Sequence, residues 1–487
     1  MSNEMVLQKT NNIAIHIYIF FCSVLMSLFA TSNPFSLINV GDSSVYVYIA
    51  KVIINGGMPY RDTFDHKGPL IYLIDALGLM LDEKTGIWIV ELFSIYITFL
   101  FVFKMAHLLQ CNEFLSCFII TLGIFILLIY FQGGNLTEEY ACAFIAISLY
   151  YFLLFFYTGI VEIHQIIING ASFAAVCMLR PNMIALWIVM CMGIVFVCMK
   201  DNRKIVILQW VKWFVTGILA IMMPILIWLV ANGAFDAFID DYIIFNMMYS
   251  SDSEMASFEN VIGAIKFFIF DCGHVLLVGI PFLFYFCIKQ NKLEDWLCLG
   301  VVLLSVIMSC ISGRKSAHYG MIFYPLIVYV MARVFSRFVS FQNKSAMVKC
   351  IKVSIIPVCI LFTIFFVFMP WLSFLNKEIE EDKQIATLVQ SVTSKEDRIS
   401  VCGNNNTIYL LSNRESASKY SYQFPIANIN SNVWKEYFDD IKKLTAKVII
   451  VLPGTYETYP YKQIATVLKD SYILIGHVGK TEVYLLK

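Results

Sequence analysis

One acidic residue near the start of the chain has the properties of a catalytic base. Asp42 follows an apolar stretch that ends near Ala30, and it opens an amphipathic segment at residues 43–54. A carboxylate at a helix start can act as its N-cap by accepting a backbone N–H. At a membrane surface, the same carboxylate can take the proton from a hydroxyl group that attacks an anomeric carbon. The two roles do not exclude each other.

A second polar cluster, Asp65-His66-Lys67, lies directly before the short apolar segment 69–81. A solvated turn would explain such a cluster. Alternatively, Lys67 could bind a phosphate group through its ammonium charge. Asp65 and His66 are residue types that bind metals, but their spacing matches no metal motif. The sequence therefore leaves the metal requirement open.

Two adjacent carboxylates, Glu138 and Glu139, open another long apolar stretch. Negative charge is favourable at the N-terminal end of a helix dipole, and Asn135 or Thr137 could cap this helix. Carboxylates at membrane depth are costly, however, and they often mark function. We therefore treat both glutamates as candidate catalytic residues.

A cationic cluster precedes a later apolar stretch. It contains Arg314, Lys315 and His318. A pair of cations whose charges reach toward water at a helix end would explain it. A nearby anion such as a lipid phosphate would explain it equally well.

The composition is that of a membrane protein. Of 487 residues, 59% are hydrophobic and 14% are charged, whereas soluble domains carry about a quarter charged residues. Lys plus Arg and Asp plus Glu both number 35, so no basic excess indicates a nucleic-acid partner. Long apolar runs predict about eleven transmembrane helices, near residues 14–31, 87–109, 114–131, 139–158, 164–179, 182–199, 206–231, 272–288, 295–312, 319–338 and 350–371.

Charge in the connecting segments predicts the orientation of the chain. Lys and Arg concentrate near residues 200–204, 289–292 and 333–352, which the positive-inside rule places in the cytoplasm. All four polar clusters then lie outside. Residues 1–375 would form the membrane domain, with outer loops 32–86 and 232–271.

The remaining residues, 376–487, are more polar and form a predicted small extracytoplasmic α/β domain. Short β-rich runs alternate there with helical patterns, which is typical of such a domain. The expected strands are 399–402, 448–452, 473–477 and 482–486, and the expected helices are 378–392, 433–444 and 461–469. Gly479-Lys480 predicts a hairpin between the last two strands.

The polar motifs resemble those of the GT-C glycosyltransferases. An Asp directly after the first membrane helix is followed by Gly-x-Pro-Tyr-x-Asp at residues 57–62 and Asp-His-Lys-Gly-Pro-Leu at residues 65–70. This is most similar to the bacterial protein mannosyltransferase and aminoarabinose transferase-like branch, as is the pattern His318-Tyr319 with Pro325. The chain departs from better-known members in having Lys-Gly-Pro for Lys-Pro-Pro, and Glu-Glu in the second acidic motif.

This resemblance implies a polytopic α-helical GT-C-like fold and an inverting transfer, metal-independent or metal-assisted. A hexosyl or pentosyl group would move from a polyprenyl-phosphate donor to a lipid, glycan or protein acceptor at the outer face of the cytoplasmic membrane. No other cofactor is implied, and the remaining partners are membrane lipids. The implied catalytic residues are Asp42, Glu138 and Glu139, and the implied substrate-binding residues are Tyr60, Asp65, His66, Lys67, Arg314 and His318.

Three alternative functions compete with a glycosyltransferase. A transporter or flippase for a lipid-linked glycan would place charged residues near the bilayer midplane, whereas Asp75, Glu91 and Lys104 lie near span ends or in surface segments. A non-catalytic scaffold would need no carboxylates in two separate outer loops. A polymerase or ligase of surface polysaccharide is chemically close to the transferase.

Overall fold

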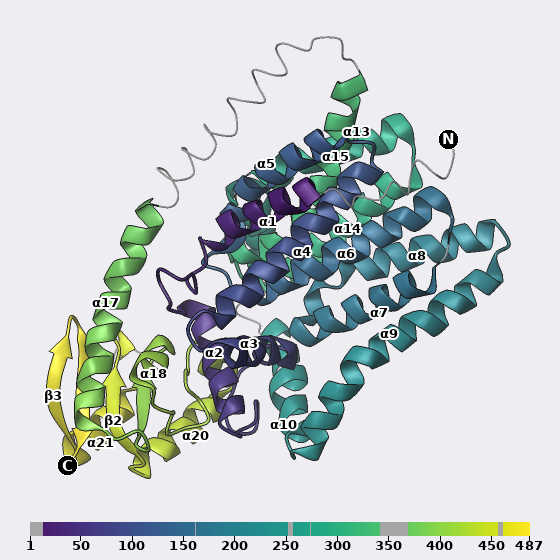
Figure 1. The fold of residues 1–487 in the computed structure, drawn as a ribbon. Helices are drawn as coiled ribbons and strands as arrows, with labels where there is room; N and C mark the ends of the chain where they lie inside the picture. The colour runs from purple at the N-terminus through teal and green to yellow at the C-terminus, as the bar shows by residue number, and fades with distance from the viewer. Residues whose placement is uncertain (1–12, 161, 252–256, 273, 341–368, 456–460) are drawn as a thin grey trace. The chain divides into compact units, whose positions relative to one another are not determined.

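The computed structural model describes residues 13–160, 162–251, 257–272, 274–340, 369–455 and 461–487 (Figure 1). The chain divides into two compact units. Unit 1 comprises Met1–Pro34, Ile87–Ile227 and Ser253–Thr363, and unit 2 comprises Phe35–Gly86, Trp228–Asp252 and Ile364–Lys487. Each unit is therefore assembled from segments that are far apart in the sequence.

The described part of unit 1 is helical. Its helices are runs of Leu, Ile, Val and Phe, and a helix satisfies its backbone hydrogen bonds internally, as a lipid environment requires. The elements are α1 (Ile13–Ser27), α4 (Gly86–Leu108), α5 (Glu113–Phe131), α6 (Thr137–Thr158), α7 (Ile163–Leu179), η2 (Pro181–Met183), α8 (Ala185–Lys200), α9 (Lys204–Ala231), α12 (Phe258–Lys266), η4 (Phe267–Asp271), α13 (Val275–Gln290), α14 (Leu293–Cys310), η5 (Ala317–Phe323) and α15 (Tyr324–Ser340).

These helices make the chain a multi-pass membrane protein. Among the described residues, six helical stretches are long and apolar enough to cross a membrane, or seven if Phe258–Asp271 and Val275–Gln290 form one bent span. Helices α1, α7 and α8 are apolar but shorter. Each predicted span except the last coincides with a helix, and the span at 350–371 falls mostly outside the described residues. The exact number of crossings therefore stays a prediction.

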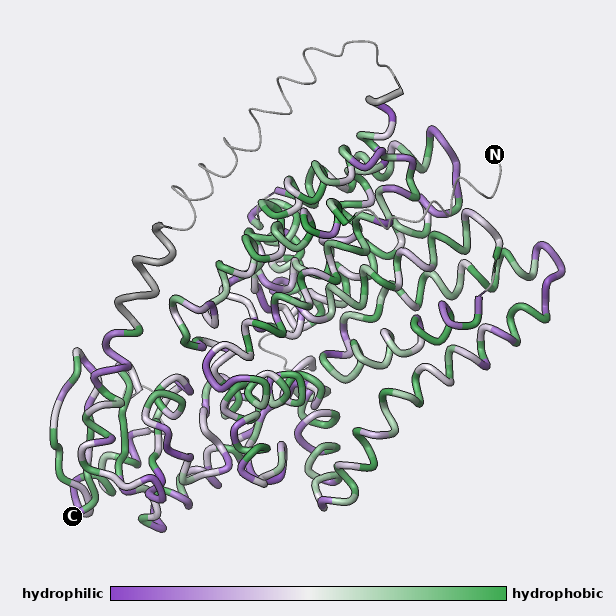
Figure 2. Tube along the Cα trace, viewed as in Figure 1, coloured by the Kyte–Doolittle hydropathy of each residue, from purple (hydrophilic) through white to green (hydrophobic). Residues whose placement is uncertain are grey.

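The hydropathy of the chain follows this division into elements. Figure 2 shows hydrophobic residues along almost the whole length of the long helices. On α9, apolar side chains such as Ile205 and Leu208 are 73% and 70% exposed. A water-soluble protein rarely exposes a long apolar stripe of this kind, which fits a helix that faces lipid.

Unit 2 combines helices with one small sheet. Its elements are α2 (Gly41–Ile54), α3 (Pro69–Leu81), α10 (Phe235–Phe238), η3 (Ile239–Ile244), α11 (Phe245–Ser251), α17 (Met369–Val392), β1 (Arg398–Cys402), α18 (Thr407–Ser412), α19 (Ile426–Ile429), α20 (Ser431–Lys442), β2 (Ala446–Val451), α21 (Lys462–Ser471), β3 (Tyr472–Val478) and β4 (Thr481–Leu486). Helix α2 packs against α3 and α18.

The sheet has the strand order β1-β2-β4-β3. Strands β1 and β2 are parallel and are joined by a helical crossover, while β4 is antiparallel to both β2 and β3. All four predicted strands occur, and the hairpin at Gly479, whose φ is 58°, is confirmed. The predicted boundary at 375/376 concerns what lies inside and outside the membrane, and it stays a prediction.

The secondary structure of residues 232–271 differs from the prediction. Residues 232–271 read as a mixed loop in the sequence, but their described part consists largely of short helices and helical turns. Phe238, Tyr242 and Phe245 are buried there, and a helical backbone pairs the N–H and C=O groups that are buried with them.

Candidate active site

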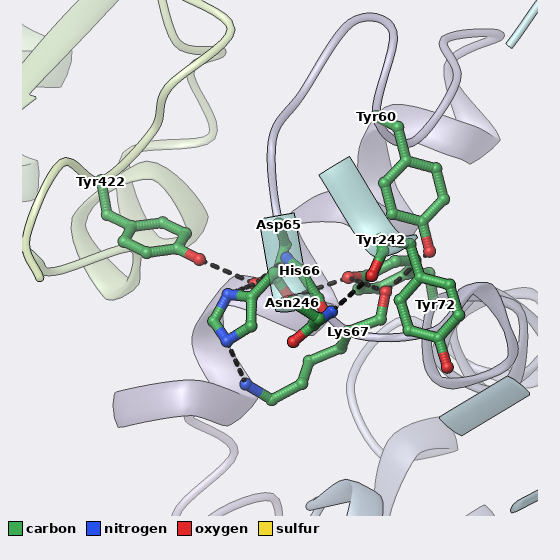
Figure 3. A network of polar contacts seen from close by, with 8 residues as sticks. All are labelled: Tyr60, Asp65, His66, Lys67, Tyr72, Tyr242, Asn246 and Tyr422. Atoms are coloured by element: carbon green, nitrogen blue, oxygen red, sulfur yellow. Dashed lines mark hydrogen bonds and ion pairs between the residues drawn. The ribbon is translucent and has the colours of Figure 1, made fainter. Parts of the chain in front are cut away.

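The buried carboxylate of Asp65 organises a polar network within unit 2 (Figure 3). Asp65 is 2% exposed. Its Oδ1 accepts hydrogen bonds from the Tyr422 hydroxyl at 2.7 Å and from the backbone N–H of His66 at 2.8 Å, and its Oδ2 accepts one from the Tyr72 hydroxyl at 2.8 Å. These three donors hold the carboxylate in one orientation.

The surroundings of Asp65 keep it ionised. Burial alone would raise the pKa of its carboxyl group, but the interaction with His66, the charge of Lys67 and the hydrogen bond from Tyr422 outweigh burial. The pKa of Asp65 therefore lies well below its usual value. Burial and the neighbouring carboxylates of Asp65 and Asp42 raise the pKa of Tyr422, so its hydroxyl stays a donor. Asp65 is thus a fixed negative charge and a poor base.

The geometry around His66 defines its tautomer. Lys67 Nζ lies 3.1 Å from His66 Nε2. Because an ammonium group can only donate, Nε2 must be the acceptor, and the ring hydrogen then resides on Nδ1, which lies 3.4 Å from Asp65 Oδ1. The ring also packs against Tyr249, with centroids 4.8 Å apart. Asp65 and His66 together fix the Lys67 ammonium group.

Backbone contacts hold the same segment. Tyr60 is fully buried, and its hydroxyl donates to the carbonyl oxygen of Lys67 at 2.7 Å. The Asn246 side chain donates to the carbonyl oxygen of His66 at 2.6 Å. Tyr60 is therefore too buried to contact a substrate from solvent, and it holds Lys67 through the Lys67 backbone. The side chain of Lys67 is left to project from a rigid support.

Asp42 differs from Asp65 in its environment. It lies in the first turn of α2 and is exposed to solvent. The expectation that Asp42 caps this helix is wrong, because Val40 occupies the N-cap position and no side chain caps the helix. Asp42 is nevertheless within electrostatic reach of Tyr422. An accessible carboxylate thus stands in the same unit as the fixed Lys67.

An ion pair joins the C-terminal part of unit 2 to residues 239–244. Lys419 Nζ lies 2.8 Å from Asp241 Oδ2. Burial raises the pKa of Asp241 to about 6, although the charge of Lys419 opposes this shift. The backbone N–H of Phe64 donates to the Lys419 carbonyl oxygen at 2.9 Å. These contacts position the segment before Asp65.

The glutamates of the second acidic motif belong to unit 1. Glu138 Oε1 accepts a hydrogen bond from Arg180 at 2.6 Å, and its Oε2 accepts one from Thr137 at 2.9 Å. The Arg180 guanidinium also lies 4.1 Å from the ring centroid of Tyr319. The prediction that Asn135 or Thr137 caps this helix is wrong, because Leu136 is the N-cap of α6 and no side chain caps the helix. Glu138 instead orients Arg180.

Glu139 has a buried carboxylic partner that sequence reasoning did not assign to the site. Its carboxyl group interacts with that of Glu91, which is fully buried on α4. Among the described residues, Oε1 of each of these two carboxyl groups has no hydrogen-bond partner. Ser32 donates to Glu91, and the backbone N–H of Asn135 donates to Glu139 at 2.8 Å. Gly134 has a φ of 77° and abuts Glu91, so only glycine fits there.

The cationic cluster is also part of unit 1. His318 Nδ1 lies 2.8 Å from the Gln132 amide oxygen and 2.8 Å from Ser316 Oγ. Arg314 is half-buried. The candidate residues therefore form two sets, one in each unit: Asp42, Tyr60, Asp65, His66 and Lys67 in unit 2, and Glu138, Glu139, Arg314 and His318 in unit 1.

No metal centre emerges from the part of the chain that the structure describes. No three His, Cys, Asp or Glu side chains gather there in a way that could hold a metal ion. Asp65 and His66 are occupied with each other, with two tyrosines and with Lys67.

Four partners of the site were missed by sequence reasoning or given little weight. Tyr422 lies 357 positions from Asp65, and Asn246 lies 180 positions from His66. Neither stands in a recognisable motif. Arg180 and Glu91 carry the only available signal, a charged residue in or beside an apolar helix.

The fold is shared with solved structures. ArnT from Cupriavidus metallidurans bound to undecaprenyl phosphate is similar with a TM-score of 0.68 at 12% identity, over 98% of this chain and 98% of that chain. ArnT from the same organism in the apo state gives a TM-score of 0.63 at 13% identity, over 96% and 97% of the two chains. The expected GT-C fold is confirmed.

The family follows from the sequence itself. Residues 7–376 match the family described as putative competence-induced protein Ccs4 N-terminal domain, and the chain belongs to that family. No curated protein matches the chain.

Proposed function

We propose that the chain is an inverting glycosyltransferase that moves a hexosyl or pentosyl group from a polyprenyl-phosphate donor to a cell-envelope acceptor. The observation that carries the proposal is that unit 2 contains both an exposed carboxylate, Asp42, and a cation held by its neighbours, Lys67. A base and an anion-binding group are what such a transfer requires. The fold shared with ArnT, whose structure contains undecaprenyl phosphate, supports the same conclusion.

The reaction would proceed in one displacement. Asp42 takes the proton from the acceptor hydroxyl as its oxygen attacks the anomeric carbon, and the bond from that carbon to the donor phosphate oxygen breaks. Polyprenyl phosphate leaves with the electron pair, and the ammonium group of Lys67 stabilises its negative charge. Asp65 and His66 hold that ammonium group in place, and Tyr60 holds the Lys67 backbone. No step is assigned to a metal ion.

The residues of unit 1 complete the proposal. Glu139 remains a candidate catalytic residue, Glu138 becomes a candidate positioning residue, and Arg314 and His318 remain candidate donor-binding residues. Glu138 would act by positioning Arg180, whose guanidinium it binds at 2.6 Å.

The chemistry determines where the enzyme would work. Nucleotide sugars are confined to the cytoplasm, so a transferase on the outer face must use a sugar that arrives on a lipid. We place the active site and residues 376–487 outside the cytoplasmic membrane, in accord with the Lys and Arg of the connecting segments. The acceptor would be a lipid, a glycan or a protein.

A lipid-linked glycan transporter is the second candidate. The buried pair Glu91–Glu139 favours it, because ionisable groups inside spanning helices often lie on transport pathways. A transporter would move a labelled lipid-linked glycan across a proteoliposome membrane without breaking any glycosidic bond.

The transferase is tested with a panel of radiolabelled polyprenyl-phosphate sugars. Wild-type membranes should transfer label from at least one of them. Lys67→Ala should raise the KM for that donor by about tenfold or more, Lys67→Arg should retain most of the affinity, and the exposed Lys84→Ala on the same unit should behave as wild type. An unchanged donor KM in Lys67→Ala would show that Lys67 does not bind the phosphate.

A further inference from the structure

Unit 2 contains a cavity that includes none of the candidate active-site residues. Its volume is about 310 Å³, near the lower end of the roughly 300–1,000 Å³ typical of small-molecule sites. One wall is the C-terminal half of α2, with Tyr48 and Lys51, together with its C-cap Asn55, and the others are residues 395–398 and 413–415 with Tyr409. The walls thus come from three stretches that are distant in sequence.

Most charged groups around this cavity are already engaged. Arg414 donates to the side chain and carbonyl group of Thr393 and to two further carbonyl oxygens. Asp397 accepts two hydrogen bonds from Ser394, at 2.7 and 2.9 Å. Glu415 accepts one from Asn55 at 3.0 Å and lies 3.8 Å from Arg398. Glu396 is exposed to solvent.

Two cations remain without such partners. Among the residues that the structure describes, neither Lys51 nor Lys395 forms a hydrogen bond or an ion pair through its ammonium group, and Lys395 is exposed to solvent. Lys51 is half-buried, and burial lowers its pKa while the charge of Glu83 opposes that shift. A partly desolvated ammonium group is costly unless an anion accompanies it. Lys51 therefore gives the cavity a partly desolvated cation that a bound anion would stabilise.

The remaining lining restricts the ligand further. Asn55 and Asn413 bring amide groups to the wall, and Tyr48 and Tyr409 bring aromatic rings 5.1 Å apart between centroids. Amides match the hydroxyl groups of a sugar, and aromatic rings match its apolar faces. Inorganic phosphate alone would leave most of the volume unfilled.

We propose that this cavity binds an anionic saccharide, whose phosphate or carboxylate group is bound by Lys51 and Lys395. Asn55 and Asn413 would bind its hydroxyl groups. If the proposed function is correct, this saccharide is part of the acceptor glycan; that assignment rests on the proposed function, whereas the binding itself does not.

Isothermal titration of the full-length chain in detergent tests the site. The probes are glucose 6-phosphate, glucuronate, glucose and inorganic phosphate. One of the two anionic sugars should bind at least about tenfold more tightly than both glucose and inorganic phosphate, and which one it is separates a phosphorylated from a uronic-acid ligand. Equal affinity for all four probes, or no binding of either anionic sugar, would overturn the proposal.

Variants link the binding to the cavity. Lys51→Met should weaken the preferred sugar by about tenfold, Lys51→Arg should restore most of the affinity, and the exposed Lys462→Met should have no effect. Unchanged affinity in Lys51→Met, with an unchanged melting temperature, would place the binding elsewhere and refute the site.

The two proposals fail separately. A chain that binds the anionic sugar but transfers nothing from any donor would refute the glycosyltransferase alone. A chain that transfers sugar but prefers no anionic saccharide would refute the cavity site alone.

Discussion

Replacing Tyr422 by Phe removes one hydrogen bond to the buried carboxylate of Asp65 and should loosen the segment that carries Lys67. A hydrogen bond to a charged group contributes about 1.5–3 kcal/mol. Asp65 retains the bonds from Tyr72 and from the His66 backbone, so it is not left unsatisfied. We therefore expect a loss of about 1.5 kcal/mol, which makes local opening roughly tenfold more frequent.

Hydrogen–deuterium exchange at Phe64 measures this opening. The N–H of Phe64 donates to the Lys419 carbonyl oxygen at 2.9 Å, and the residue is 1% exposed. Its exchange should therefore accelerate about tenfold in Tyr422→Phe. Tyr420→Phe is the matched control, because its hydroxyl lies on the same segment but donates to Glu436 at 2.8 Å.

Two results would refute this reasoning. Exchange at Phe64 that is the same in Tyr422→Phe and wild type would show that the bond to Asp65 does not hold the segment. Equal acceleration in Tyr420→Phe would show that any lost hydroxyl has this effect. In an Asp65→Asn background, Tyr422→Phe should add much less than it does alone.

The remaining predictions concern buried charges. Glu91→Gln should leave thermal stability nearly unchanged, because an amide can donate to Glu139, whereas Glu91→Ala should cost about 1–3 kcal/mol; equal losses would contradict the interaction between the two side chains. Arg180→Ala should destabilise by about 3 kcal/mol by leaving Glu138 buried without its cation, and adding Glu138→Gln should recover part of the loss; no recovery would contradict the pairing. The folded protein binds the Asp241 proton more tightly than the unfolded chain does, because the pKa of Asp241 is raised to about 6. As the pH rises from 4 to 6, wild type should therefore lose up to about 3 kcal/mol of stability from this group, and above pH 6 the group should cause no further loss. Melting temperatures across this pH range should show no such contribution in Asp241→Asn, and identical pH profiles would contradict the shift.

Local patterns were sufficient to predict much of the fold. Long apolar runs gave the spanning helices, because a helix in lipid must satisfy its own backbone. Alternating β-rich and helical segments gave all four strands of the sheet and the hairpin at Gly479. Asp65, His66 and Lys67 were found together because they are neighbours in sequence and interact directly.

The missed features depend on contacts between distant segments. The Tyr422 hydroxyl that holds Asp65 comes from 357 positions away, and no local pattern distinguishes it from the chain's other tyrosines. Glu91 pairs with Glu139 only because α4 and α6 belong to one packed unit. The predicted caps of α2 and α6 were also wrong, since their N-cap residues, Val40 and Leu136, are extended and have no capping side chain.

The central claim is that Asp42 is the base in a sugar transfer from a lipid phosphate. The most direct test measures, for wild type and Asp42→Asn, both sugar transfer from the preferred polyprenyl-phosphate donor and the affinity for polyprenyl phosphate. We predict that Asp42→Asn reduces transfer by about 100-fold or more, as expected for loss of a general base, while the affinity for polyprenyl phosphate stays the same. Transfer that persists in Asp42→Asn at the wild-type rate would contradict the account.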